Sequence, residues 1–246
     1  MKYYTAFLIT VISVFALNNC KTSENTGDTI VVEKDPNLSE ASSQVVISLT
    51  KGKSFNHPTF VIWEEDMEGN YKRTLYITKS YASGIFGHEM VGDSIWLNKA
   101  GSSYQPAALP YWTHRKGLIE NKYSIPTPDH PFVDAYTGAT PKQNFKFETE
   151  SNSSEDSYRI LLEINQTADW NHYWTNNKYP DNPAYKHSAQ PSIIYAVTVN
   201  EEDAVFYMNP IGHGDPKGET GKLFTDLSTL TTVKEILNSV KIEINR

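Results

Sequence analysis

Short runs rich in β-branched and aromatic residues recur through residues 45–246, and they limit the folds that this chain can adopt. Several runs alternate apolar and polar residues, as in Tyr158–Ile164 and Val240–Ile244. Such alternation is typical of antiparallel strands that have one solvated face. The predicted strands are Val45–Leu49, Thr59–Glu64, Thr74–Thr78, Phe145–Glu148, Tyr158–Ile164, Ile193–Val199, Ala204–Met208 and Val240–Ile244.

Two pairs of neighbouring runs have the pattern of hairpins. The first covers Thr59–Thr78 and turns at Met67–Asn70, which contains a glycine. The second joins Ile193–Val199 to Ala204–Met208 through the polar segment Asn200–Asp203. We therefore expect each pair to lie side by side in one sheet.

The spacing of these runs favours one fold class. Residues 45–246 number about 200, enough for a single core, and no linker divides them. The runs come at irregular intervals with long loops between them. This favours an all-β, two-sheet sandwich of immunoglobulin-like type over a barrel. At most one or two short helices are expected, the clearest at Thr231–Asn238 with a threonine as its cap.

Two long segments between the strands are rich in tryptophan and tyrosine. They run from Ser80 to about Asn144 and over Gln166–Gln190. Loops of this length usually have a function or contain short elements of their own. Their rings could shelter a planar ligand by stacking, or they could close the open ends of the sandwich. For most of the rings we favour the second interpretation.

The N-terminus has the pattern of an export signal. Residues 1–19 carry Lys2 and an apolar run from Ala6 to Leu17, which is too short to span a bilayer. The run ends in Leu-Asn-Asn-Cys, which looks like a lipobox with Cys20 as the lipidated residue. Cys20 is the only cysteine, so no internal disulfide can form. A plain cleaved signal followed by an incidental cysteine remains the alternative.

The segment after the anchor is polar. Lys21–Ser43 contains one small apolar patch, Ile30–Val32, and cannot bury enough apolar surface to offset its ordering entropy. We therefore predict a flexible tether over residues 20–44, then a single domain over 45–246. The net charge of −7 argues against a nucleic-acid partner, which would favour a basic patch.

Residues 134–140 read Asp-Ala-Tyr-Thr-Gly-Ala-Thr. This fits the pattern Asp-x-x-[Ser/Thr]-Gly-Ala-[Ser/Thr], which resembles the acceptor site of bacterial flavin transferases. The resemblance implies that FMN is joined covalently, through its phosphate, to the hydroxyl of Thr140. Asp134 can fix a turn through backbone hydrogen bonds, Thr137 fills the hydroxyl position before the glycine, Gly138 adds backbone freedom and Ala139 adds little bulk. A simple strand-connecting turn is the alternative.

Two further blocks extend the resemblance. The first hairpin, the block Leu109–Gly117 and the segment 134–141 together resemble an uncharacterised family of predicted periplasmic domains. Genes of that family are commonly found beside PepSY-type membrane proteins and flavin transferases. The resemblance implies a redox setting in the cell envelope, with a flavin transferase and possibly a PepSY-type membrane protein as partners.

The block Leu109–Gly117 also has chemistry of its own. Trp112 could stack on a flavin, while Arg115 and Lys116 could neutralise the phosphate of an FMN ester on Thr140. A solvated surface pair is an equally good interpretation of the two cations.

Other motifs are weaker. The loop Gly212–Lys222 lacks the Ser or Thr that a phosphate-binding loop needs after its lysine, so we expect a polar loop. The histidines show no metal-binding spacing, although His172, His187 and His213 could converge in space. The acidic run Glu64–Asp66 suggests a solvated strand end.

These observations lead to one main hypothesis. It is a lipid-anchored protein of the bacterial cell envelope, periplasmic or at the cell surface, that carries covalent FMN and exchanges electrons with a membrane partner. An electron carrier or binding protein is favoured over a substrate-converting enzyme. The alternative is a non-redox binding or structural envelope lipoprotein, and a metal-handling domain ranks third.

Overall fold

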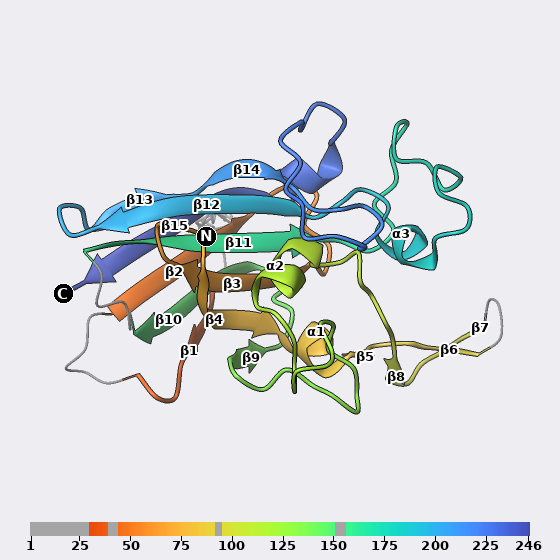
Figure 1. Cartoon of the computed structure of the whole chain (residues 1–246), viewed down its shortest axis with the longest axis horizontal. Helices are drawn as coiled ribbons and strands as arrows, with labels where there is room; N and C mark the ends of the chain where they lie inside the picture. The colour runs from red at the N-terminus through yellow and green to blue at the C-terminus, as the bar shows by residue number, and fades with distance from the viewer. Residues whose placement is uncertain (1–29, 39–43, 92–94, 151–155) are drawn as a thin grey trace, which may run out of the picture.

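The protein is a two-sheet sandwich, which confirms the predicted all-β class (Figure 1). The computed structural model describes residues 30–38, 44–91, 95–150 and 156–246. The predicted signal peptide, Cys20 and the first part of the predicted tether lie outside these residues. The five-stranded sheet is ordered β1 (Ile30–Lys34), β10 (Asn144–Glu150), β2 (Gln44–Lys51), β15 (Leu237–Asn245) and β13 (Val205–Tyr207). The six-stranded sheet is ordered β14 (Asn209–His213), β12 (Ile193–Asn200), β11 (Ser157–Asn165), β3 (Thr59–Glu65), β4 (Tyr71–Thr78) and β9 (Tyr136–Gly138).

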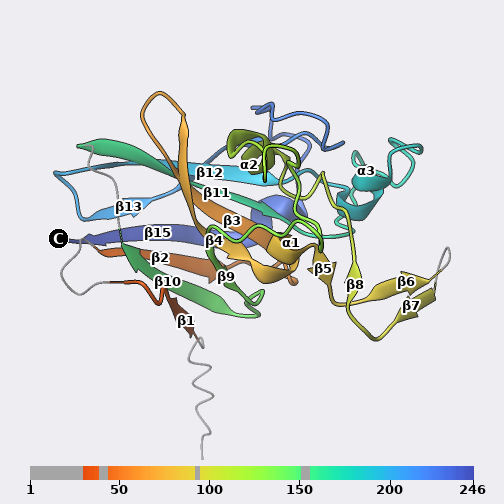
Figure 2. The same ribbon diagram turned by 60° about the horizontal axis from the view of Figure 1, so that its bottom comes forward.

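The remaining elements are short and lie within the long loops. The paired ribbons are β5 (Ile85–Phe86) with β8 (Gly101–Ser102), and β6 (Glu89–Val91) with β7 (Ile95–Leu97). Figures 1 and 2 both show the β6–β7 ribbon projecting away from the sandwich. The helices are α1 (Lys79–Ser83), α2 (Pro110–Arg115), α3 (Pro183–Ser188) and the 3₁₀ turn η1 (Thr232–Glu235).

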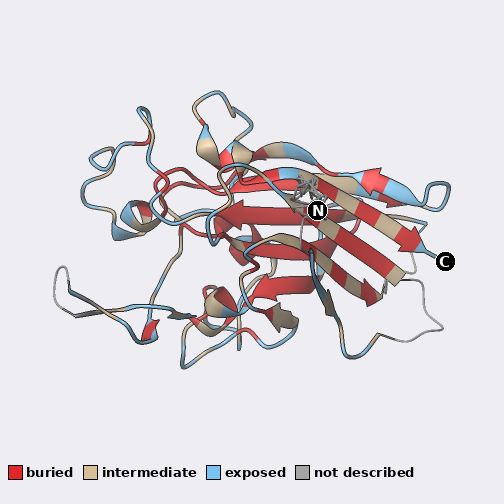
Figure 3. Cartoon of the chain, turned by 180° about the vertical axis from the view of Figure 1, so that it is seen from behind, coloured by how far each residue is buried: buried red, intermediate tan, exposed pale blue. Residues whose placement is uncertain are grey.

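The main core fills the space between the sheets. Along β10 the inward side chains Phe145 and Phe147 alternate with partly exposed residues. Val240 and Ile242 on β15 do the same, and Figure 3 shows these alternating bands of burial. The Tyr76 ring of β4 packs 4.9 Å from that of Phe145, which ties the two sheets together.

A second core covers the outer face of the six-stranded sheet. On β3, Phe60 and Ile62 belong to the main core, whereas Val61 and Trp63 belong to the second. The helices α1 and α2 contribute Tyr81 and other side chains to this second core. Because both faces of β3 are covered, its sequence is continuously apolar rather than alternating.

The hairpin predictions have different outcomes. β3 and β4 pair antiparallel as predicted, and the turn between them uses Gly69 with a φ of 84°. The second predicted hairpin is wrong, because β12 and β13 lie in different sheets. β12 pairs with β14, while β13 pairs with β15. The chain therefore crosses to the five-stranded sheet, where the Met208 N–H still donates to the carbonyl of Val240 on β15, and it returns to the six-stranded sheet with β14.

The helix predictions need correction. The segment Thr231–Asn238 forms only the η1 turn, because β15 already begins at Leu237. The described residues contain α1, α2 and α3 as well, so the limit of one or two short helices is exceeded. In the part of the chain that the structure describes, no helix is long and apolar enough to cross a membrane.

The predicted tether contains a strand at its carboxyl-terminal end. β1 pairs in parallel with β10, matching Ile30 to Asn144 and Lys34 to Glu148. Its apolar side chains remain exposed, Ile30 by 55%, so backbone pairing rather than burial holds this strand. The structured domain thus begins before residue 45.

The acidic run Glu64–Asp66 at the end of β3 is buried rather than solvated. Glu64 accepts a hydrogen bond from Nε of Arg73 at 2.7 Å. Glu65 accepts from the indole N–H of Trp63 at 2.9 Å and forms an ion pair with Arg159 at 3.5 Å. Buried carboxylates require such partners, and a single sequence does not reveal which cations will lie opposite.

Candidate functional site

The segment Asp134–Thr140 lies at an edge of the six-stranded sheet. Within it, β9 pairs in parallel with β4, matching Tyr136 to Tyr76, and is the last strand of the sheet. Asp134 and Ala139, on either side of β9, are exposed. The segment is therefore a short edge strand with accessible ends, whereas both interpretations of the sequence placed a turn here.

Thr140 leaves the sheet directly after this strand. Its side chain is partly exposed, and no described residue forms a hydrogen bond with its hydroxyl. The preceding carbonyl, of Ala139, accepts a hydrogen bond from the Tyr76 hydroxyl at 3.2 Å. Pro141, which follows, is buried. The backbone is thus held on both sides of Thr140, whose hydroxyl has no hydrogen-bond partner in the described part of the chain.

Two side chains, Glu33 and Tyr76, lie very close to the backbone of Gly138. Its φ is not in the left-handed region, so backbone freedom is not the reason for this residue. A Cβ placed here would lie 2.1 Å from Oε2 of Glu33 and 2.4 Å from the Tyr76 hydroxyl. Glycine therefore lets the Glu33 carboxylate and the Tyr76 hydroxyl lie against the backbone of β9, and a larger residue would displace these two side-chain ends.

Glu33 is an unusual neighbour for this strand. Its Oε2 atom is buried and forms no hydrogen bond of normal geometry with a described residue, although the hydroxyls of Tyr136 and Tyr76 lie close. Burial raises the pKa of Glu33, and those two hydroxyls lower it by a smaller amount. Sequence analysis missed Glu33 because it lies in the segment predicted to be a tether.

A cavity of about 480 Å³ opens beside the motif. This volume lies within the range of about 300–1,000 Å³ that small-molecule and cofactor sites occupy. Its lining comes from the segment after β1, from β4, from β9 and the residues leading into it, and from β10: Asp35, Pro36, Asn37, Arg73, Thr74, Leu75, Val133, Asp134, Ala135, Tyr136, Thr137 and Thr149. Motif residues and a cavity large enough for a planar cofactor therefore adjoin each other.

Trp112 lies in α2 and is fully buried. Its indole N–H donates to the hydroxyl of Thr74 at 2.9 Å, and its ring meets that of Phe132 edge-on at 5.2 Å. Tyr81 packs against it at 6.2 Å. In this structure the ring is enclosed by the second core and presents no free face for stacking on a ligand.

Arg115 and Lys116 already have partners within the fold. Arg115 donates to the Tyr111 hydroxyl at 2.9 Å and to the carbonyl of Gly69 at 3.3 Å. Lys116 donates to the carbonyl of Ser124 at 2.6 Å, and burial lowers its pKa to about 8. These contacts fix α2, and the structure shows neither cation bound to Thr140.

The α2 block nevertheless approaches the motif indirectly. Phe132, two residues before Asp134, contacts the Trp112 ring and lies 5.8 Å from Nζ of Lys116. Thr74, the partner of the Trp112 indole, lines the cavity beside the motif. The block therefore supports the wall of the cavity rather than its interior.

The histidines do not form a metal site in the described part of the chain. No group of three or more His, Cys, Asp or Glu side chains there is arranged to hold a metal ion. His213 and His187 line two different cavities. The predicted loop Gly212–Lys222 begins only at Gly214, because Gly212 and His213 belong to β14, and Gly218 within it adopts a φ of 71°.

Comparisons with protein-family models, curated proteins and solved structures found no match for this chain.

Proposed function

We propose that this protein is a lipid-anchored redox protein of the cell envelope that carries FMN as a phosphoester on Thr140. In this role it exchanges electrons with a membrane partner and does not convert a substrate itself. The flavin supplies the redox chemistry, and the protein supplies attachment, orientation and surroundings.

One observation supports the proposal: Thr140 is partly exposed, its hydroxyl has no hydrogen-bond partner among the described residues, and it follows an edge strand that lines a cavity. A transferase must reach this oxygen, and Asp134 and Ala139 are exposed on the approach. The cavity beside Tyr136 and Thr137 has room for a planar ring system. The resemblance of residues 134–140 to flavin acceptor sites gives this geometry its chemical meaning.

The attachment reaction is a group transfer without a redox change. The Thr140 oxygen attacks the phosphorus of the FMN half of FAD, and a P–O bond forms. The diphosphate bond breaks, AMP departs, and the hydroxyl proton passes to a base of the transferase or to water. Thr137 and Gly138 hold the acceptor at the end of β9 while this occurs.

The test is flavin attachment to variants made together with a flavin transferase. We expect fluorescence in a denaturing gel for the wild type and for Thr140→Ser, and none for Thr140→Ala. Thr198→Ala, at an exposed position of β12, is the matched control and should remain fluorescent. A dark wild-type band, or a fluorescent Thr140→Ala band, would remove the proposal.

The anchor has a separate test. Cys20→Ser should release the protein from the membrane fraction without altering flavin attachment. Continued membrane retention of that variant would contradict lipidation at Cys20.

A second candidate function is a non-redox binding lipoprotein of the cell envelope. It is favoured by a larger aromatic cavity of about 710 Å³ near α3. The two roles are compatible, since this cavity and the cavity beside the motif share no lining residue.

A further inference from the structure

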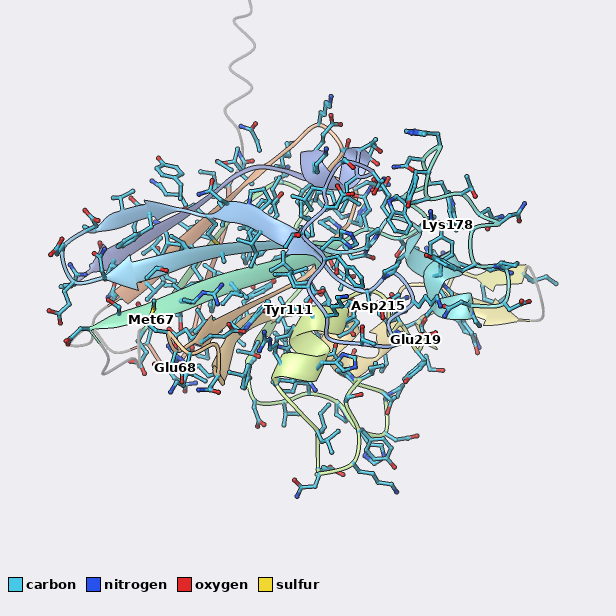
Figure 4. The ribbon with its side chains drawn as sticks, turned by 45° about the horizontal axis from the view of Figure 1, so that its top comes forward. Met67, Glu68, Tyr111, Lys178, Asp215 and Glu219 are labelled. Carbon is cyan, nitrogen blue, oxygen red and sulfur yellow. The ribbon has the colours of Figure 1, made fainter. Side chains whose placement is uncertain are left out.

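The segment between α3 and β12 lies at one end of the sandwich. Figure 4 shows this end at the label Lys178, whereas Met67 and Glu68 mark the β3–β4 turn at the opposite end. β12 enters the six-stranded sheet here, and η1 leads at the same end into β15 of the five-stranded sheet. Four polar side chains meet between these segments: Asp169, Gln190, Thr231 and Thr232.

The backbone holds Asp169 and Gln190 side by side. The N–H of Asp169 donates to the carbonyl of Ser188 at 3.2 Å, and the N–H of Gln190 donates to the carbonyl of Asp169 at 3.1 Å. Ala189, which precedes Gln190, is buried and has a φ of 68° and a ψ of −95°. This conformation is strained for any residue other than glycine, and such strain persists only where the surrounding structure enforces it.

The Thr232 hydroxyl lies between a carboxylate and an amide. Its Oγ1 atom is hydrogen-bonded to Oδ1 of Asp169 and accepts from Nε2 of Gln190 at 2.5 Å. Because an ionised carboxylate can only accept, the hydroxyl donates its proton to Asp169 and keeps its lone pairs for Gln190. An amide C–N bond is about 1.33 Å long, so Oγ1 lies no more than about 3.8 Å from Cδ of Gln190. This limit is close to the separation of about 3–3.5 Å from which nucleophiles attack.

The side-chain carbonyl of Gln190 faces two donors. Its Oε1 atom accepts the backbone N–H of Thr231 at 2.7 Å and the Thr231 hydroxyl at 3.2 Å. The side-chain amide of Asn171 donates to Oγ1 of Thr231 at 3.1 Å and so holds that hydroxyl in place. Donors aimed at a carbonyl oxygen stabilise the negative charge that develops there during nucleophilic attack.

Asp169 has the surroundings of a general base. Its side chain is buried, and its Oδ2 atom forms no hydrogen bond of normal geometry with a described residue, although the Gln190 side chain lies close. Burial raises the pKa of Asp169, against the opposing hydrogen bonds from Thr232 and Gln190. A carboxylate with a raised pKa accepts a proton more readily, and this one touches both the hydroxyl and the amide.

We propose that Thr232 and Gln190 join in an intramolecular ester. The Thr232 oxygen attacks Cδ of Gln190 and an O–C bond forms, while Asp169 takes the hydroxyl proton. The bond between Cδ and Nε2 then breaks, Asp169 passes the proton to the nitrogen, and ammonia leaves. The reaction is a group transfer that needs no oxidant and no added reactant.

The ester links the two sheets covalently. Gln190 precedes β12 of the six-stranded sheet, and Thr232 precedes β15 of the five-stranded sheet. The 246 residues contain a single cysteine, so no disulfide within them can supply such a link. Gln190 is fully buried, which keeps water from the bond. Neither residue lines the cavity beside residues 134–140, so this chemistry is independent of the proposed flavin.

The test is mass spectrometry of the full-length protein after denaturation and digestion with trypsin. Cleavage after lysine leaves Gln190 in the peptide 187–217 and Thr232 in the peptide 223–234. We expect the two peptides as one covalent species, lighter than their sum by one ammonia, about 17 Da. Hydroxylamine should separate them, because it cleaves esters under conditions that leave amides intact.

Variants test the role of each group. Thr232→Val removes the hydroxyl at nearly constant shape and should abolish the linked species, whereas Thr232→Ser should retain it. Asp169→Asn removes the base and should slow formation of the link at least about a hundredfold. Thr225→Val is the matched control, because Thr225 is exposed and lies in the same tryptic peptide as Thr232. It should yield as much linked species as the wild type.

Three results would overturn the proposal. They are a wild-type digest that contains only the separate peptides with intact Gln190, a linked species that persists in Thr232→Val, and formation of the link by Asp169→Asn at the wild-type rate. The wild-type digest decides whether the bond exists even where a variant folds poorly.

Discussion

Gly138 shows how one residue sets the geometry of an entire edge. It lies where β9 meets both β4 and Glu33 of β1, and the hypothetical Cβ distances of 2.1 and 2.4 Å leave no room for a side chain. The sequence analysis explained Gly138 by the backbone freedom of glycine, but the structure gives a different reason. Gly138 leaves space for the Glu33 carboxylate and the Tyr76 hydroxyl beside β9, and its φ is not unusual.

We expect Gly138→Ala to lower the free energy of unfolding by about 1–3 kcal/mol, the usual cost of forcing a group into a packed site. Gly87→Ala is the control, because a Cβ there would meet nothing within 4 Å. Glu33→Ala should restore part of the loss in the double variant, since it removes the nearer contact. Urea unfolding measures the free energy of unfolding of the wild type, Gly138→Ala, Gly87→Ala and the Gly138→Ala/Glu33→Ala double variant. Equal stability of Gly138→Ala and Gly87→Ala would refute this explanation.

Sequence reasoning located the site only in part. Residues 134–140 were identified because they form one uninterrupted segment that fits the acceptor pattern. Glu33, Tyr76 and Arg73 were missed, since they reach the motif or its cavity from strands distant in sequence. The burial of Trp112 was missed for the same reason, because it depends on Phe132 and Tyr81 packing around α2.

At the scale of single elements, α2 depends on a buried carboxylate. Glu163 of β11 accepts the backbone N–H groups of Trp112 at 2.7 Å and Tyr111 at 3.2 Å, and the Ser192 hydroxyl at 2.5 Å. It thus bonds N–H groups in the first turn of α2, which a helix leaves unsatisfied. Burial raises the pKa of Glu163 to about 7, although these three hydrogen bonds oppose the shift.

This pKa makes the stability of the fold dependent on pH. Because the folded pKa of about 7 exceeds the ordinary 4.5, the folded protein keeps a proton in this interval that the unfolded chain has lost. The stabilising contribution is complete below pH 4.5 and is lost as the pH rises through 7. From pH 4.5 to 8, the free energy of unfolding should fall by about 3 kcal/mol more in the wild type than in Glu163→Gln. Chemical denaturation across this range measures both proteins, and parallel pH profiles would contradict the assignment.

Strands and turns were predicted correctly where the local sequence pattern determines their structure. Alternation identified β11 and β15, and the turn at Gly69 identified the first hairpin. The pairing of β13 with β15 was not predictable, because the choice of partner strand depends on contacts far apart in sequence. The helices α1, α2 and α3 were missed because each is only five or six residues long.

Across the whole molecule, two cores share one sheet. β3 sends Phe60 and Ile62 into the main core and Val61 and Trp63 into the second. The β3–β4 pair therefore forms part of both, and neither core can lose it without exposing the other. Such sharing should make the sandwich and its helical cover unfold together.

Conservative truncations in the two cores test this. Ile62→Val in the main core and Ile77→Val in the second should each lower the free energy of unfolding by about 0.5–1.5 kcal/mol. Each substitution should shift a single unfolding transition. Tryptophan fluorescence and far-ultraviolet circular dichroism should report the same midpoint for it. Separate transitions for the two probes would show that the cores are independent.

Together with the proposed anchor, the position of β1 limits the distance between residues 134–140 and a bilayer. β1 lies next to β10 and close to β9 (Figure 2), and its Glu33 approaches Gly138, two residues before the proposed acceptor Thr140. Fully stretched, the chain from Cys20 to Ile30 covers about 35 Å. If Cys20 carries the proposed lipid, Ile30 can lie no more than about 35 Å from the lipid headgroups. Any protein that meets the Thr140 edge then works close to the bilayer surface.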